Sequence, residues 1–181
     1  MAATDQTSTI TGTWNVDPAH SSLGFAVRHS GVATFRGEVG EFEGSLDATG
    51  GELRLVGTGN AASLSTGSPD RDAHLSSPDF FDAERHPELR FESSRIELDG
   101  DDVVVHGDLT LRGTTRPVEL RGELVGPVVD AFGTPRVGLE LAGKVDRTEY
   151  GISWNTPLPG GDLLLSNTVK ITASFSLTPA S

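Results

Sequence analysis

Apolar residues alternate with small or polar residues along most of the chain. In the stretch from Trp14 to Gly44 the alternation is clearest, at Leu23, Phe25 and Val27. Because successive side chains of a β-strand point to opposite faces, this period of two predicts a strand with one apolar face. The same alternation recurs at Leu53 and Leu55, Val103 and Val105, Leu109 and Leu111, Val118 and Leu120, Val137, Leu139 and Leu141, and Val169, Ile171, Ala173, Phe175 and Leu177. A chain built almost entirely of such strands either packs two sheets together or closes into a barrel.

One segment, around residues 69–86, loses this alternation and carries signals for helix initiation. Pro69 suits the first turn of a helix, and Asp72 is expected to cap the helix start. We predict one or two short helices here that join two strands of the barrel. Such an insert usually covers one end of a barrel, and Phe80 and Phe81 would form its apolar surface.

Glycine residues separate the apolar runs. The chain has 22 glycines, which suit tight turns, bulges and corners in a strongly bent sheet. Asp99 and Gly100 lie between two alternating runs and predict a tight hairpin. Internal repeats and low-complexity segments are not evident.

Composition limits the function classes. With 181 residues, the chain is long enough for one domain with its own core, and we expect a flexible tail at residues 1–12 and a single domain at 13–181. The absence of cysteine excludes disulfides and thiolate catalysis. A net charge of −12 argues against nucleic acid or an anionic membrane surface as the main partner. The polar N-terminus lacks a secretory signal and no segment is apolar enough for stable membrane insertion, so we expect a cytoplasmic protein.

Several short sequence blocks occur along the chain in an order and with a spacing that are typical of one protein family. They are WNVDPAHS (14–21), FAVRH (25–29), FRG (35–37), FEG (42–44), RDAHL (71–75), DFFDA (79–83), FES (91–93), GDLTLRGTTRPV (107–118) and DRTEYG (146–151). In these blocks the chain resembles the YceI-like family, the bacterial polyisoprenoid-binding, lipocalin-like proteins. The resemblance extends from about Trp14 to Leu177.

The resemblance implies a fold, a ligand and an assembly. The fold would be an all-β, lipocalin-like, eight-stranded antiparallel barrel with the short helical insert. Its long apolar interior would hold an isoprenoid or other lipid ligand, and the protein would be a homodimer, as family members often are. The family's members are commonly exported, and this chain differs in lacking a signal sequence.

The sequence also nominates residues for the ligand site. We expect the ligand chain to lie along the aromatic and aliphatic residues of the lumen and its polar head to lie at the rim. The expected ligand-binding residues are Phe25, Val27, Arg71, His74, Phe80, Phe81, Phe91, Trp154 and Phe175. Arg71 has two interpretations, because a guanidinium either binds a carboxylate and fixes the insert to the rim or meets the lipid head. Arg147 has the same two interpretations.

The leading hypothesis is a non-enzymatic protein that binds, sequesters or transports a polyisoprenoid, a polyprenyl quinone or a fatty-acyl derivative. No nucleophile elbow or nucleotide-binding loop is present, and the histidines have no metal-ligand spacing, so we expect no cofactor and no metal. One alternative is a lipid- or quinone-modifying enzyme that uses His20, His29 or His74 as acid or base. Another is a stress-associated interaction module whose barrel is filled by its own side chains.

Overall fold

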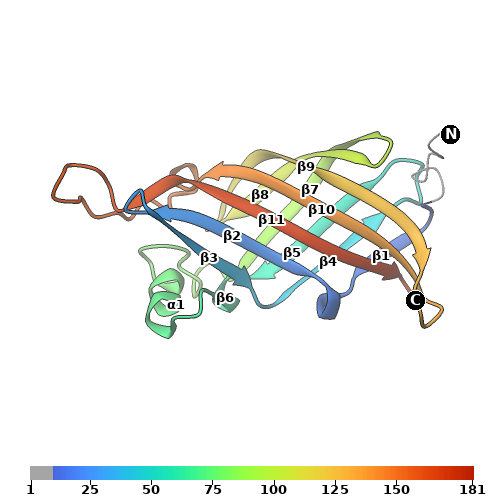
Figure 1. The fold of residues 1–181 in the computed structure, drawn as a ribbon, viewed down its shortest axis with the longest axis horizontal. Coiled ribbons are helices and arrows are strands. Elements are labelled where there is room, and N and C mark those ends of the chain that lie inside the picture. Colours follow the sequence, from blue (N-terminus) through green and yellow to red (C-terminus); the bar gives the residue numbers. More distant parts are fainter. Residues whose placement is uncertain (1–9) are drawn as a thin grey trace.

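Eight long strands form a closed antiparallel barrel in the computed structural model, which describes residues 10–181 (Figure 1). Five of these strands are continuous, namely β7 (Glu88–Asp99), β8 (Asp102–Leu111), β9 (Thr114–Val129), β10 (Pro135–Asp146) and β11 (Leu165–Pro179). The other three are each broken into two pieces, which are β1 (Thr13–Val16) with β2 (Ser22–His29), β3 (Ala33–Val39) with β4 (Phe42–Asp47), and β5 (Arg54–Asn60) with β6 (Leu64–Ser65).

The barrel closes through β1. In the ring order β1-β4-β5-β7-β8-β9-β10-β11, β1 pairs with both β4 and β11, so Trp14 lies opposite Leu46 on one side and Pro179 on the other. The predicted eight-stranded antiparallel barrel is therefore confirmed. The predicted hairpin is confirmed as well, because Asp99 pairs with Asp102 and Gly100 adopts the left-handed conformation with φ of 62°.

At the opposite end the barrel wall is split. One piece of each broken strand lies at this end, so the wall continues from β11 to β2, then β3 and finally the two-residue β6. Among residues 10–181, β6 pairs only with β3, so the ladder is interrupted between β6 and β7. One backbone hydrogen bond, from Ala61 N–H to Pro87 O at 2.8 Å, bridges the start of this interruption. Helix α1 (Pro69–Ser76) lies beside β6 at this end (Figure 1).

The insert contains one helix followed by turns. Ser68, rather than Asp72, is the N-cap of α1, since its hydroxyl accepts the Arg71 N–H at 3.4 Å. The predicted capping role of Asp72 is therefore wrong. Its carboxylate instead accepts the N–H and hydroxyl of Thr66, at 2.8 and 2.7 Å, and so anchors the helix to the segment that precedes it. Residues 77–86 form turns and return the chain to β7.

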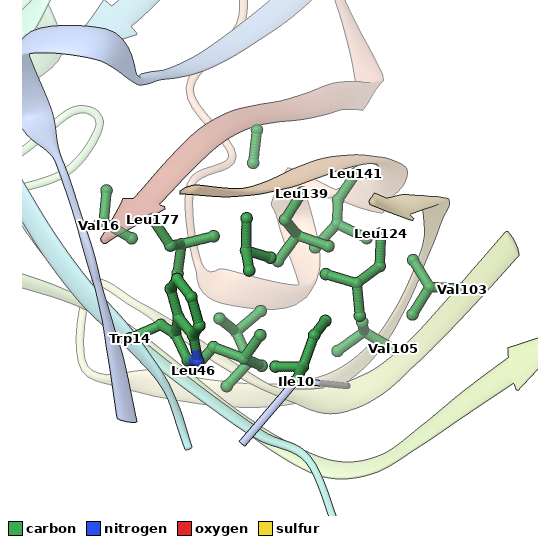
Figure 2. Packing of buried hydrophobic residues seen from close by; sticks show 13 residues of the cluster. Ile10, Trp14, Val16, Leu46, Val103, Val105, Leu124, Leu139, Leu141 and Leu177 are labelled. Carbon is green, nitrogen blue, oxygen red and sulfur yellow. The ribbon is translucent and has the colours of Figure 1, made fainter. Parts of the chain in front are cut away.

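The closed end of the barrel is filled with apolar side chains. Figure 2 shows inward-pointing residues from several strands packed against one another, with Trp14, Leu46, Leu124, Leu139 and Leu177 near the centre. Each of these five is buried, and Leu177 has no exposed surface. Residues 1–9 of the predicted tail lie outside the described residues, whereas Ile10 is buried in this core.

Candidate functional site

A cavity of about 300 Å³ lies at the split end of the barrel, between the barrel wall and the insert. A second cavity of about 100 Å³ lies farther toward the closed end. The two adjoin, because Leu23, Leu89, Leu109 and Ile171 line both of them. The barrel interior is thus packed at the closed end and hollow at the split end.

The alternation of each strand makes the cavity wall apolar. On β11, Val169 and Ile171 line the larger cavity, whereas Lys170 between them and Thr172 after them are exposed on the outer face. On β8, Leu109 and Leu111 line the same cavity. Pockets for small molecules are typically about 300–1,000 Å³ in volume, apolar, and supplied with a few polar groups. The larger cavity has these properties.

Two glycines allow phenylalanine rings to lie against the backbone of the wall. Gly37 lies opposite Phe25 in the β2–β3 ladder, and a Cβ added at Gly37 would lie 2.4 Å from Phe25 Cζ. Likewise, a Cβ added at Gly107 would lie 2.5 Å from Phe91 Cζ. Any side chain at these glycines would push the ring away from its present position, so the glycines fix the shape of both cavities.

An aromatic and cationic cluster lies at the rim of the larger cavity. The guanidinium of Arg71 lies over the ring of Phe35, with Cζ 4.2 Å from the ring centroid, and the His29 ring lies 4.3 Å from the same ring. Arg71 also donates to Thr66 O at 3.5 Å. No ion pair to Arg71 is formed within residues 10–181, so the carboxylate partner of the first interpretation of Arg71 is absent there and the cation–π stack takes its place.

His74 connects the helix to the aromatic residues of the rim. Its ring meets the rings of Phe80 and Trp154 edge-on, with both centroids at 4.8 Å. Its Nε2 lies 3.0 Å from Asp79 Oδ2, and its side chain is 39% exposed. Phe80 is buried beneath this contact, so the insert is held in place by aromatic packing rather than by strand pairing.

Arg147 is the buried charged group of the cavity wall. It begins the short helix η4 (Arg147–Tyr150) and is 5% exposed. Its Nε donates to Ser166 O at 2.9 Å, and its Nη1 donates to Ile152 O and Trp154 O at 2.8 and 2.9 Å. Its Nη2 is fully buried and has no hydrogen-bond partner among the described residues. Burial lowers the pKa of the Arg147 guanidinium from its usual value.

Tyr150 has a comparable unpaired group. Its hydroxyl is buried without a hydrogen-bond partner in the part of the chain that the structure describes. Burial raises the pKa of this hydroxyl to about 12. Tyr150 does not line either cavity, so it contributes to the packing behind the wall.

The structure places all nine sequence-nominated residues along the hollow part of the barrel. Seven line the larger cavity, and they are Phe25, Val27, Arg71, His74, Phe80, Phe81 and Trp154. Phe91 and Phe175 line the smaller cavity. The sequence did not nominate Phe35, Leu64 or Ile152, which also line the larger cavity. Phe35 lies between the exposed polar residues Thr34 and Arg36, and this alternation is the pattern that would identify it as a lumen residue.

The histidines named for an enzyme do not form a buried catalytic pair. His20 Nδ1 lies 2.7 Å from Asp17 Oδ2, but the His20 side chain is 65% exposed. His29 and His74 lie at the rim, where both rings pack on aromatic residues. Within residues 10–181, no three acidic, histidine or cysteine side chains are arranged to hold a metal ion. None of the helices in that range has the length and apolar character needed to cross a membrane.

Comparison with known proteins gives consistent matches over most of the chain. The sequence model of the YceI-like domain family matches residues 14–177. Protein YceI of Escherichia coli is 33% identical over 136 residues, which cover 74% of this chain and 71% of that protein. A UPF0312 protein of Photorhabdus laumondii is 37% identical over 134 residues, which cover 72% of this chain and 70% of that protein.

Solved structures share the fold. BcnA of Burkholderia cenocepacia superposes with a TM-score of 0.76 at 18% identity, over 89% of this chain and 98% of that chain. A polyisoprenoid-binding domain from Saccharophagus degradans superposes with a TM-score of 0.63 at 16% identity, over 94% of this chain and all of that chain. At 16–18% sequence identity, these two superpositions show a shared fold and nothing further.

Proposed function

The chain belongs to the YceI-like family, and from this membership we propose that it binds a long apolar amphiphile inside the barrel without catalysing a reaction. A polyisoprenoid, a polyprenyl quinone or a fatty-acyl derivative has the required shape. The observation that carries the proposal is the pair of adjoining apolar cavities at the split end of the barrel. The polyisoprenoid-binding domain of S. degradans, which has the same fold, supports the isoprenoid class.

The cavity wall can account for useful affinity. Each buried methylene contributes about 0.8 kcal/mol, so about ten of them contribute about 8 kcal/mol. Loss of translational and rotational freedom costs about 4 kcal/mol or more. Against the smallest of these costs, about 4 kcal/mol, the remainder favours binding before any polar contact is made.

The alternatives receive less support. The cavities count against a filled-core interaction module, because a filled barrel would leave no space for a guest. An enzyme would require a histidine in a position to move a proton within the cavity. His20 does not line the cavity, and the rings of His29 and His74, which do line it, are packed against aromatic rings at its rim. We therefore propose binding, sequestration or transport as the function.

The test compares two tryptophan substitutions on the same strand. Ile171→Trp places a large side chain at a position that lines both cavities, whereas Thr172→Trp places one on the exposed outer face. Each purified variant and the wild type are incubated with geranylgeraniol, and native mass spectrometry measures the bound fraction. We expect the wild type and Thr172→Trp to bind the ligand. We expect Ile171→Trp to lose at least about 10-fold in affinity, because the tryptophan side chain would occupy space that the ligand needs and overpacking the lumen is unfavourable.

Circular dichroism shows whether each variant is folded, and Leu109→Phe provides a smaller change at a position that also lines both cavities. Failure of the wild type to bind geranylgeraniol, oleate or a prenyl quinone would contradict the proposal. Equal binding by folded Ile171→Trp and Thr172→Trp would place the ligand outside the lumen.

A further inference from the structure

Arg147 is a buried cation that forms no ion pair within residues 10–181. A guanidinium remains protonated in proteins, and an isolated buried charge is costly unless it is paired and hydrogen-bonded. The partners that hold Arg147 are the neutral carbonyl groups of Ser166, Ile152 and Trp154. The carboxylate of the adjacent Asp146 is turned to the N–H and hydroxyl of Thr148.

These contacts satisfy only part of the guanidinium. Arg147 has five N–H donors in a planar fork. Nε and Nη1 are used by the three carbonyl groups, whereas the two hydrogens of Nη2 have no acceptor within residues 10–181. Arg147 itself lines the larger cavity. An unpaired, charged donor in an apolar wall favours a ligand that brings its own anionic oxygen.

We propose that Arg147 binds an anionic oxygen, of a carboxylate or a phosphate, at the head of the amphiphile inside the larger cavity. This inference rests on the proposed binding function and names the chemistry of the head group. A planar guanidinium suits either oxyanion, because both present acceptor oxygens to its N–H donors.

The position of Arg147 also sets the orientation of the ligand. Arg147 lines the larger cavity and not the smaller one, which is lined by Phe42, Phe91 and Phe175. With its head at Arg147, the amphiphile extends its tail past Leu109 toward the smaller cavity. The polar head is thus held within the wall at η4 and not by Arg71, which is already stacked on an aromatic ring.

The wild-type protein provides the first test, through ligands that share a tail and differ in the head. Oleate is compared with oleyl alcohol and octadecene, and geranylgeranyl phosphate is compared with geranylgeraniol, by calorimetry or by displacement of a fluorescent fatty acid. A charge-assisted hydrogen bond predicts that each anion binds about 10-fold or more tightly than its alcohol. The two anionic arms show whether a carboxylate, a phosphate or both are accepted.

Equal affinities within each series would overturn the assignment of the head group while leaving the proposed binding function intact. Loss of binding by every ligand, including octadecene and geranylgeraniol, would instead contradict the binding function. The two failures are therefore distinguishable. Neither result depends on a substitution at Arg147, whose side chain also donates to the carbonyl groups of Ser166, Ile152 and Trp154.

A pair of variants then locates the head. Arg147→Met removes the buried donor and Arg71→Met removes the cation at the rim. We expect Arg147→Met to lose the advantage of oleate over oleyl alcohol while both ligands still bind through their tails. Loss of that advantage in Arg71→Met, with its retention in Arg147→Met, would overturn the proposal and assign the head to the rim. Where Arg147→Met does not fold, the wild-type ligand series decides.

Discussion

At the scale of single residues, Arg136 joins parts of the chain that are distant in sequence. Its Nε donates to Asp130 Oδ2 at 2.7 Å, and its Nη1 donates to Asp17 Oδ2 at 3.0 Å. Asp17 in turn caps η2 (Pro18–His20), the break between β1 and β2. The Arg136 guanidinium and two loop N–H groups lower the pKa of Asp130 to about 2, and Arg136 and His20 lower the pKa of Asp17.

These lowered pKa values predict how stability depends on pH. A carboxyl group whose pKa is lower in the folded state stabilises the fold above its unfolded pKa, and this contribution is lost as the pH falls through the folded pKa. For Asp130 the relevant range is from about pH 4 down to about pH 2. We expect Asp130→Asn to be less stable than the wild type at pH 7 and to lose less stability over this range, as measured by urea unfolding at several pH values.

The matched control is Asp162→Asn, which changes an exposed carboxylate in the loop before β11. We expect its stability profile to follow that of the wild type. A profile for Asp130→Asn parallel to the wild-type profile between pH 4 and pH 2 would show that the ion pair does not contribute to acid stability.

The sequence located the lumen residues but not all of their partners. Phe25 and Val27 were predicted to face inward from the alternation alone, because the side-chain period of a strand is two. The partner of Arg71 depends instead on how the insert packs against the barrel, because Phe35 lies on the distant strand β3. The partner of Asp72, Thr66, is close in sequence, but the contact depends on how the chain turns into α1. The unpaired Nη2 of Arg147 likewise depends on the conformation of the loop around it.

At the scale of secondary-structure elements, close approach of neighbouring strands restricts some positions to glycine. A Cβ added at Gly122 on β9 would lie 1.7 Å from Glu140 O on β10, which is far inside van der Waals contact. We expect Gly122→Ala to force the two strands apart and to lower the free energy of unfolding by about 2 kcal/mol or more, measured by chemical denaturation.

Gly57 on β5 provides the control for this substitution. A Cβ there would have Glu43 O as its nearest neighbour at 3.5 Å, an ordinary contact distance. We expect Gly57→Ala to leave the stability within about 0.5 kcal/mol of the wild type. If both substitutions lowered the free energy of unfolding by the same amount, the loss of glycine itself, and not the separation of the strands, would account for the destabilisation.

The elements themselves were predictable in kind more than in detail. The barrel, the hairpin at Gly100 and a helix starting at Pro69 all follow from local patterns. The breaks in three strands were not predicted, because apolar residues continue to alternate on either side of each break. At the first break, Asp17 and Pro18 form a capped turn, yet the chain on both sides still pairs with β11.

At the scale of the whole molecule, the two ends of the barrel should differ in local stability. Regions with fewer strand-to-strand hydrogen bonds open more readily. Residues 69–86 cover the interruption between β6 and β7 through side-chain packing, whereas β8 and β10 are paired on both sides. We expect amide hydrogen exchange, measured by mass spectrometry without ligand, to be faster in residues 69–86 than in β8 or β10.

Addition of a ligand should narrow this difference. A molecule that binds only the folded state stabilises it by about 2.7 kcal/mol at 100 times its Kd. Because Phe80 and Phe81 line the larger cavity, ligand binding is expected to slow exchange in residues 69–86 more than in β8. Equal protection of the two regions would indicate that the insert does not respond to occupancy of the cavity.

The dense core at the β1 end makes the lumen a blind-ended tube. Leu124, Leu139 and Leu177 fill that end, and each has at most 2% of its surface exposed. A bound ligand would therefore have to leave the lumen by the route through which it entered. A molecule that delivers the ligand and a molecule that receives it would have to use the same opening, one after the other. For the proposed ligand, uptake and release would therefore take place at the same end of the barrel and at different times.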